Sequence, residues 1–240
     1  MKTAIGIMLV ILAVIAAACS EKSDSSNPTI VDEYSNGLLS TANYFVMVGT
    51  RSGSDGTLYS YIDMYVRDSN ELDDLHLKIN GVSIESGYLE PTDDYGYHIS
   101  FLDLNQYLGY AINYGSLVSY EFSYADSIYT GSIRMPRRIV GDLPDLNPNN
   151  DFNCEWSISE DPYFFLATYE NADYDHNPFA DEISSKQLLS SARQYTFSKS
   201  LWQGQSLNGK KFTISAINAD AYAGKVYFIV TNQISTQTYY

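Results

Sequence analysis

The three histidines are the residues that would most readily indicate an enzyme, because imidazole titrates near neutral pH. His76 lies between two leucines, and His98 lies between a tyrosine and an isoleucine. Alternate side chains of a strand point to opposite faces, so apolar neighbours that face a core direct both histidines toward solvent. The chain has no HExxH, CxxC, GxSxG or SxxK motif and no phosphate-binding or dinucleotide-binding glycine pattern. We therefore expect no enzyme activity. One alternative is a hydrolase with a site that these motifs do not identify.

Two stretches contain oxygen ligands of the kind that Ca²⁺ prefers. Residues 173–182 include three aspartates and a glutamate. Residues 145–156 repeat the odd-position spacing of a calcium loop, but Asn150 takes the place of its glycine and Trp156 that of its bidentate glutamate. A solvated acidic loop and a turn-rich linker explain both stretches without an ion. We expect no metal and no cofactor.

The most suggestive binding residues are Tyr59, Tyr61 and Tyr65, which alternate with apolar residues within 58–66. The alternation places the three rings on the face opposite a predicted core. Every second residue of a strand is about 6.6 Å further along, so neighbouring rings could stack together on sugar rings. Cross-strand packing of tyrosines, or cover from a second domain, explains the pattern as well. Carbohydrate binding through exposed tyrosines is therefore an alternative function.

Cys19 is preceded by a leader that decides where the protein is sent. Lys2 is followed by an apolar run over residues 4–18, which ends in three alanines. This run is shorter than the roughly 20 residues that cross a bilayer as a helix, which is typical of a cleaved signal peptide. The arrangement resembles the bacterial lipoprotein signal, although Ala16 stands where that family prefers leucine.

The lipoprotein resemblance implies that residues 1–18 are removed and that Cys19 is acylated. Two or three acyl chains hold a protein on a membrane far more firmly than one. We therefore expect a protein anchored by lipid in the cell envelope, with the outer membrane favoured, and a folded part that is periplasmic or extracellular. Residues 19–40 are rich in Ser, Asp and Asn, which is typical of a flexible tether.

Composition excludes one class of partner and indicates a fold class. The net charge is −15, with 29 acidic and 14 basic residues, which makes nucleic acid a poor partner. Cys154 is the one cysteine besides Cys19, so no intrachain disulfide is expected. The 22 tyrosines and many short alternating runs indicate an all-β protein.

Residues 41–136 contain short alternating runs separated by turn residues. Asn80 and Gly81 lie between two such runs, and this dipeptide is a strong hairpin signal because both turn positions need positive φ. Residues 103–114 have apolar spacing for one helical turn. The series of strands resembles an immunoglobulin-like module of secreted lipoproteins, which implies a β-sandwich.

Residues 137–150 contain a glycine, two prolines and three asparagines, a composition that favours a linker over a strand. Residues 151–240 then form a second series. Phe152, Cys154 and Trp156 alternate inward, and later Phe212 opens another alternating run. This order resembles fibronectin type III, although that family usually has tyrosine at the position of Phe212.

The sequence thus predicts two tandem β-sandwiches, immunoglobulin-like over 41–136 and fibronectin type III-like over 151–240. Loops at one end of a sandwich usually make its contacts. We expect a non-catalytic binding or spacer module with an unknown protein or glycan partner.

Overall fold

The computed structural model describes residues 44–53, 55–66, 75–84, 90–91, 97–124, 127–144, 147–171, 182–203, 210–222 and 226–236. The predicted signal peptide, Cys19 and the tether lie outside these ranges. The described residues form an all-β structure with one short α-helix, which confirms the predicted fold class.

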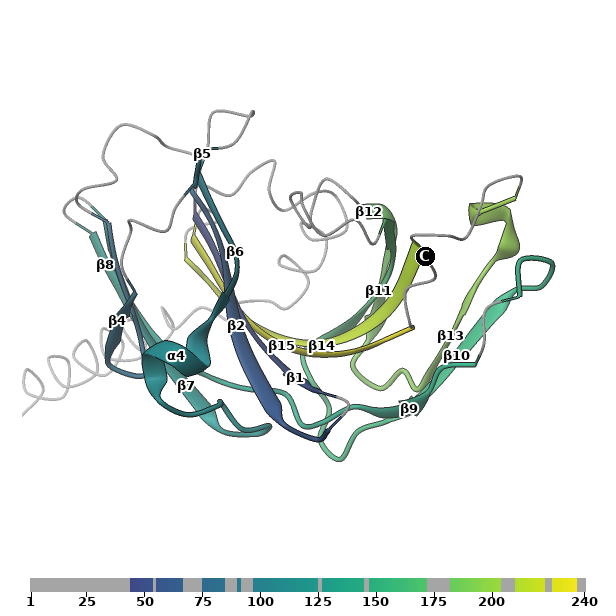
Figure 1. Ribbon diagram of the computed structural model, residues 1–240, viewed down its shortest axis with the longest axis horizontal. Coiled ribbons are helices and arrows are strands. Elements are labelled where there is room, and N and C mark those ends of the chain that lie inside the picture. The colour runs from purple at the N-terminus through teal and green to yellow at the C-terminus, as the bar shows by residue number, and fades with distance from the viewer. Residues whose placement is uncertain are drawn as a thin grey trace, which may run out of the picture.

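An eight-stranded sheet forms the centre of the molecule (Figure 1). Its strands, from one edge to the other, are β12 (Glu182–Leu189), β11 (Phe164–Asn171), β14 (Lys210–Tyr222), β15 (Val226–Ser235), β1 (Tyr44–Ser52), β2 (Leu58–Val66), β6 (Tyr97–Asp103) and β5 (Glu90–Pro91). β1 is parallel to β15, and the other neighbours are antiparallel. The sheet curves strongly, so it has a concave and a convex face (Figure 1).

Two smaller sheets pack on the convex side of the central sheet (Figure 1). The four-stranded sheet contains β4 (Val82–Ile84), β3 (His76–Ile79), β7 (Leu117–Tyr124) and β8 (Ser127–Arg134). The three-stranded sheet contains β13 (Gln194–Phe197), β10 (Phe152–Ser157) and β9 (Val140–Asp142). The helix α4 (Leu104–Leu108) follows β6, and the 3₁₀ turn η3 (Lys199–Leu201) follows β13.

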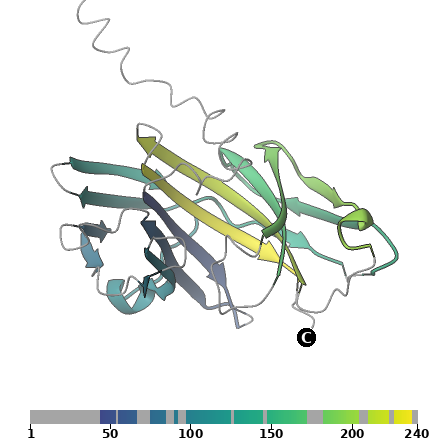
Figure 2. The same cartoon turned by 90° about the horizontal axis from the view of Figure 1, so that it is seen from above.

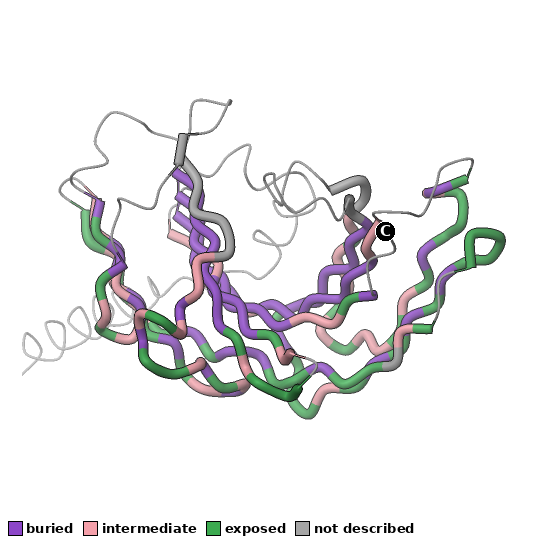
Figure 3. The backbone as a smooth tube through the Cα atoms, in the orientation of Figure 1, coloured by how far each residue is buried: buried purple, intermediate pink, exposed green. Residues whose placement is uncertain are grey.

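Strand alternation sorts the apolar side chains into three clusters. On β1, Val46 and Val48 face the four-stranded sheet and pack with Phe122 of β7. The three-stranded sheet packs through Phe152 and its neighbours on the half of the central sheet that contains β11 and β14. Phe45 belongs to a third cluster, on the concave face. Buried positions accordingly fill the central sheet, while exposed positions follow the outer sheets (Figure 3). Sheet-on-sheet packing confirms the predicted sandwich architecture.

The central sheet runs through both ranges that we predicted as separate sandwiches. β1 belongs to the first range and β15 to the second, yet they pair over Tyr44 to Thr50 opposite Val226 to Asn232. Figure 2 shows the two strands lying side by side. Sandwich packing is therefore confirmed, but a division into two tandem sandwiches is not, because both ranges contribute strands to one sheet.

The predicted linker contains a strand, so the expectation of no strand in 137–150 was wrong. β9 pairs with β10, placing Gly141 opposite Trp156. Ile139 is buried in the core beneath the three-stranded sheet. The prolines lie outside β9, so they do not interrupt its pairing. The composition of the whole stretch concealed a three-residue strand within it.

Two local predictions are confirmed. Asn80 and Gly81 have φ values of 51° and 80° and join β3 to β4 in a tight hairpin. The predicted helical turn is α4, where Asp103 caps the helix by accepting a hydrogen bond from the Asn105 backbone N–H at 2.9 Å. Short-range turn chemistry determined both features.

Candidate functional site

The predicted tyrosine row lies on β2, but only one of its rings is substantially exposed. Tyr59 is 40% exposed, whereas Tyr61 is 5% and Tyr65 is 6% exposed. Tyr65 belongs to the apolar cluster on the concave face. Tyr61 lies over Gly49 of the neighbouring strand, where a Cβ would overlap its ring. The expectation of three exposed rings was therefore wrong, because Tyr61 and Tyr65 pack on a second buried face of the sheet.

The other predicted candidates are the histidines and the two stretches with possible calcium ligands. His76 lies on β3 and is exposed, as the alternation predicted. His98 lies on β6, but its side chain is outside the described structure. Asp173 to Asp181 and Asp145 are outside it as well. In the calcium-like stretch, Asn147 Oδ1 accepts a hydrogen bond from Asn149 N at 2.9 Å, which closes a local turn. Within the described ranges, no group of three His, Cys, Asp or Glu could hold a metal ion.

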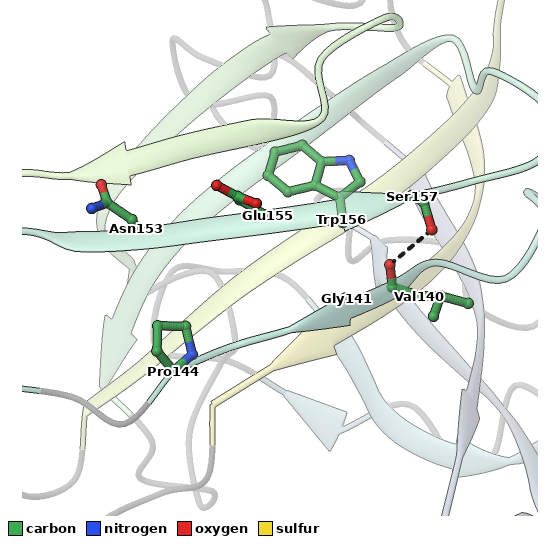
Figure 4. A pocket seen from close by; sticks show the side chains of 7 residues that line it. All are labelled: Val140, Gly141, Pro144, Asn153, Glu155, Trp156 and Ser157. Carbon is green, nitrogen blue, oxygen red and sulfur yellow. Dashed lines mark hydrogen bonds between the residues drawn. The ribbon is translucent and has the colours of Figure 1, made fainter.

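A groove runs along β9, and we call it the junction groove. Its first part is an open depression of about 740 Å³ and is lined by Val140, Gly141, Pro144, Asn153, Glu155, Trp156 and Ser157. Its second part encloses about 530 Å³ and is lined by Tyr114, Arg137, Arg138, Val140, Ser157, Ile158 and Ser159. The two parts share Val140 and Ser157 in their walls, so they adjoin each other. Figure 4 shows the first part, with Asn153 to Ser157 on β10 and Val140 on β9.

The pairing of β9 with β10 builds the wall of the junction groove. On β10, alternation exposes Asn153, Glu155 and Ser157 and buries the residues between them. Ser157 Oγ donates a hydrogen bond to the Val140 carbonyl oxygen at 3.2 Å. Gly141 is required here, because a Cβ at this position would lie 2.7 Å from the Glu155 carbonyl oxygen. Val140 is 60% exposed and lies between the two parts of the groove.

A buried asparagine fixes the chain that leads into β9. Asn232 of β15 donates hydrogen bonds from Nδ2 to the carbonyl oxygens of Pro136 at 3.1 Å and Arg137 at 2.8 Å. Its Oδ1 accepts a hydrogen bond from the Ile139 backbone N–H at 3.2 Å. These bonds satisfy backbone groups that no neighbouring strand pairs. The arginine end of the groove is therefore attached directly to the central sheet.

The arginine end of the junction groove contains residues from both halves of the chain. The Tyr114 and Ser52 hydroxyls are 3.0 Å apart, which ties the loop after α4 to β1. Arg137 Nε donates to Glu160 Oε2 at 3.1 Å, and both side chains are about half exposed. Arg138 is exposed and forms no ion pair with any residue that the structure describes.

The opposite end of the junction groove carries the other sign of charge. Glu155 is exposed and has no ion-pair partner within the described ranges. Asn153 Oδ1 accepts a hydrogen bond from Thr196 Oγ1 at 2.6 Å, which orients its amide. Arg138 and Glu155 therefore place opposite charges at the two ends of one groove.

The buried face of β10 is aromatic and apolar. The indole of Trp156 lies 5.3 Å from the ring of Phe165, and its Nε1 has no hydrogen-bond partner among the described residues. Burial raises the pKa of the Cys154 thiol to about 12, so this thiol is neutral at physiological pH. The Cys154 thiol therefore offers no negative charge to a ligand in the junction groove.

The side chains that line the junction groove offer groups that can bind a ligand. Serine hydroxyls, an amide, a carboxylate and two guanidinium groups supply hydrogen bonds and charge. The sequence interpretation missed this groove because it treated 137–150 as a linker. The adjacent pair Arg137 and Arg138, in a chain of net charge −15, was the signal that could have pointed to it.

Comparison with protein-family models and with curated proteins gives no match for this chain. Among the residues that the structure describes, no helix has the length and apolar character needed to cross a membrane.

Proposed function

We propose that this protein is a non-catalytic binding module of the cell envelope, held by acyl chains on Cys19, and that the junction groove receives its ligand. The observation that carries the proposal is that the two parts of the groove adjoin at Val140 and Ser157. Ligand sites occur preferentially where structural units meet. This groove lies where the chain passes from the four-stranded to the three-stranded sheet.

The shape and chemistry of the groove support an elongated ligand. Its polar side chains come from alternate positions of β10, which are about 6.6 Å apart along a strand. A ligand that contacts Asn153, Glu155 and Ser157 together must therefore extend along the strand. Exposed Val140 adds an apolar contact in the middle.

Carbohydrate binding through Tyr59, Tyr61 and Tyr65 has less structural support. Two of the three rings are buried, so only Tyr59 offers a face to a sugar. A single exposed aromatic ring is common on protein surfaces. The junction groove is the better candidate site.

A groove-filling substitution tests the proposed function. Ser157→Trp places a large ring in the part shared by both ends, whereas Ile128→Trp changes an exposed position of β8 outside the groove. The full-length protein in detergent and both variants are applied to glycan and peptide arrays. We expect ligands bound by the wild type to be lost with Ser157→Trp and kept with Ile128→Trp. Ligands that still bind the Ser157→Trp variant would show that their binding site lies outside the junction groove.

A further inference from the structure

We propose that the ligand of the junction groove is a carboxylated oligosaccharide, oriented with a carboxylate at Arg138 and neutral sugar units toward Glu155. This inference rests on the proposed function, because it assigns a ligand class to the same groove. It follows from the charges at the two ends and from the hydrogen-bonding groups between them.

Arg138 is the group best placed to bind an anion. The ion pairs among the described residues join Lys78 to Glu121, Arg137 to Glu160 and Arg193 to Asp161. Arg138 is in none of them, and its exposed side chain lines the groove beside Arg137. A guanidinium group binds a carboxylate through two parallel hydrogen bonds, which a lysine cannot do. The arginine end therefore holds a cation without a compensating carboxylate.

Glu155 sets the direction of the ligand. It lies in the first part of the groove, away from the arginine pair, and carries an exposed negative charge. A second carboxylate placed there would be repelled, whereas a sugar hydroxyl could donate a hydrogen bond to Glu155. A ligand with its anionic group at one end fits this distribution better than a uniform polyanion.

The middle of the groove matches the two-sided chemistry of sugar rings. Ser157 and Ser159 are exposed: the Ser159 hydroxyl can donate and accept hydrogen bonds, whereas that of Ser157, which donates to Val140, can accept one from a sugar hydroxyl. Val140 offers an apolar surface to the C–H face of a ring. Asn153 adds an amide whose oxygen is already oriented by Thr196. Alternating hydroxyl and C–H groups of an oligosaccharide would contact these in turn.

The overall charge of the protein does not prevent this contact. The net charge of −15 repels anions at long range. At physiological ionic strength, however, exposed charges are screened beyond about 8 Å. A carboxylate at hydrogen-bonding distance from Arg138 therefore experiences the local cation more than the distant acids.

Binding measurements with matched probes test the inference. Calorimetry on the full-length protein in detergent compares a tetrasaccharide of three glucose units and one terminal glucuronic acid, the methyl ester of the same tetrasaccharide, and tetraglutamate. We expect the acid to bind about tenfold more tightly than the ester, which corresponds to one charge-assisted contact of about 1.4 kcal/mol. We expect Arg138→Gln to remove this preference and Lys186→Gln, which removes an exposed charge of β12 outside the groove, to leave it. Glu155→Gln should strengthen binding of tetraglutamate, whose carboxylates Glu155 repels, and not of the saccharide acid, whose carboxylate lies at Arg138.

The outcomes separate this inference from the proposed function. Equal binding of acid and ester, both lost with Ser157→Trp, would overturn the carboxylate assignment and leave the groove as a binding site. Tetraglutamate binding as tightly as the saccharide acid would replace the sugar with an acidic peptide. A third outcome is that Ser157→Trp abolishes binding of array ligands but changes binding of none of the three probes. In that case the carboxylated oligosaccharide is the wrong ligand class. If no ligand depends on Ser157, both proposals fail.

Discussion

The hydroxyl oxygens of Tyr120 and Tyr222 lie 2.5 Å apart and join the four-stranded sheet to the central sheet. Tyr120 also donates to Asp220 Oδ2 at 2.7 Å. Tyr222 in turn lies 3.1 Å from the Thr130 carbonyl oxygen. The Tyr120 ring stacks on Phe228 with centroids 3.9 Å apart. A polar network thus closes an otherwise apolar interface between sheets.

Removing the Tyr120 hydroxyl should destabilise the fold, whereas removing that of Tyr169 should not. Tyr120→Phe leaves Asp220 without its donor, and we expect the free energy of unfolding to fall by about 1.5–3 kcal/mol. The buried Tyr169 hydroxyl has no partner among the described residues, so Tyr169→Phe should leave stability unchanged or raise it. Urea unfolding of both variants measures the difference. Equal losses would show that hydrogen bonding is not what distinguishes the two positions.

The tyrosines make stability sensitive to alkaline pH. Burial, together with the hydrogen bonds to Tyr222 and Asp220, raises the pKa of Tyr120 well above its ordinary value. A raised folded pKa means that the unfolded state loses its proton first, so the contribution of Tyr120 to stability is constant below about pH 10 and falls above it. Burial raises the pKa of Tyr169, Tyr195 and Tyr222 in the same direction.

Unfolding free energies and tyrosinate absorbance, followed together as the pH rises, check this effect. We expect a group of tyrosines to ionise only as the protein unfolds, and Tyr120→Phe to lessen the pH dependence. Ionisation of all tyrosines in one step, without unfolding, would contradict the raised pKa values.

The Cys154 thiol should be inert in the folded protein. It is buried, and burial raises its pKa to about 12, so almost no thiolate is present at neutral pH. In the Cys19→Ser chain, Cys154 is the one remaining cysteine. We expect a thiol reagent to label this chain only after denaturant is added. Rapid labelling without denaturant would show that the core beneath β10 opens.

Gly49 should be intolerant of a side chain because of Tyr61. A Cβ at Gly49 would overlap the Tyr61 ring, so Gly49→Ala should lower the free energy of unfolding by about 1–3 kcal/mol. In a Tyr61→Ala background, the same substitution should cost much less. A double-mutant cycle measured by urea unfolding gives this coupling. Additive losses would place the cost of Gly49→Ala somewhere other than the ring.

Cys19 should decide the location of the protein. The leader predicts that Cys19 is acylated. The Cys19→Ser chain cannot carry this anchor, so we expect it in the soluble fraction, whereas the wild type sediments with membranes. Cell fractionation with immunodetection compares the two, and mass spectrometry of the wild type shows the modification. An unmodified thiol, or a mutant that stays with the membranes, would refute the anchor.

The sequence by itself determined the local elements. Alternation in Leu58 to Val66 and in Phe152 to Ser157 identified strands and the residues that face inward, because a strand repeats every two residues. Positive φ at Asn80 and Gly81 follows from their residue types alone. The strand β9 was not predicted, because its three residues are too few to show a two-residue alternation.

Only the tertiary structure decided which strands are neighbours and which face is buried a second time. Alternation tells which side chains share a face but not which strand pairs with which, so nothing in the sequence placed β1 beside β15. For the same reason the burial of Tyr61 and Tyr65 could not be predicted, since it depends on the second apolar face of the sheet. The junction groove is likewise formed by residues far apart in the chain, Tyr114 and Ser157 among them, which only the folded sheets bring together.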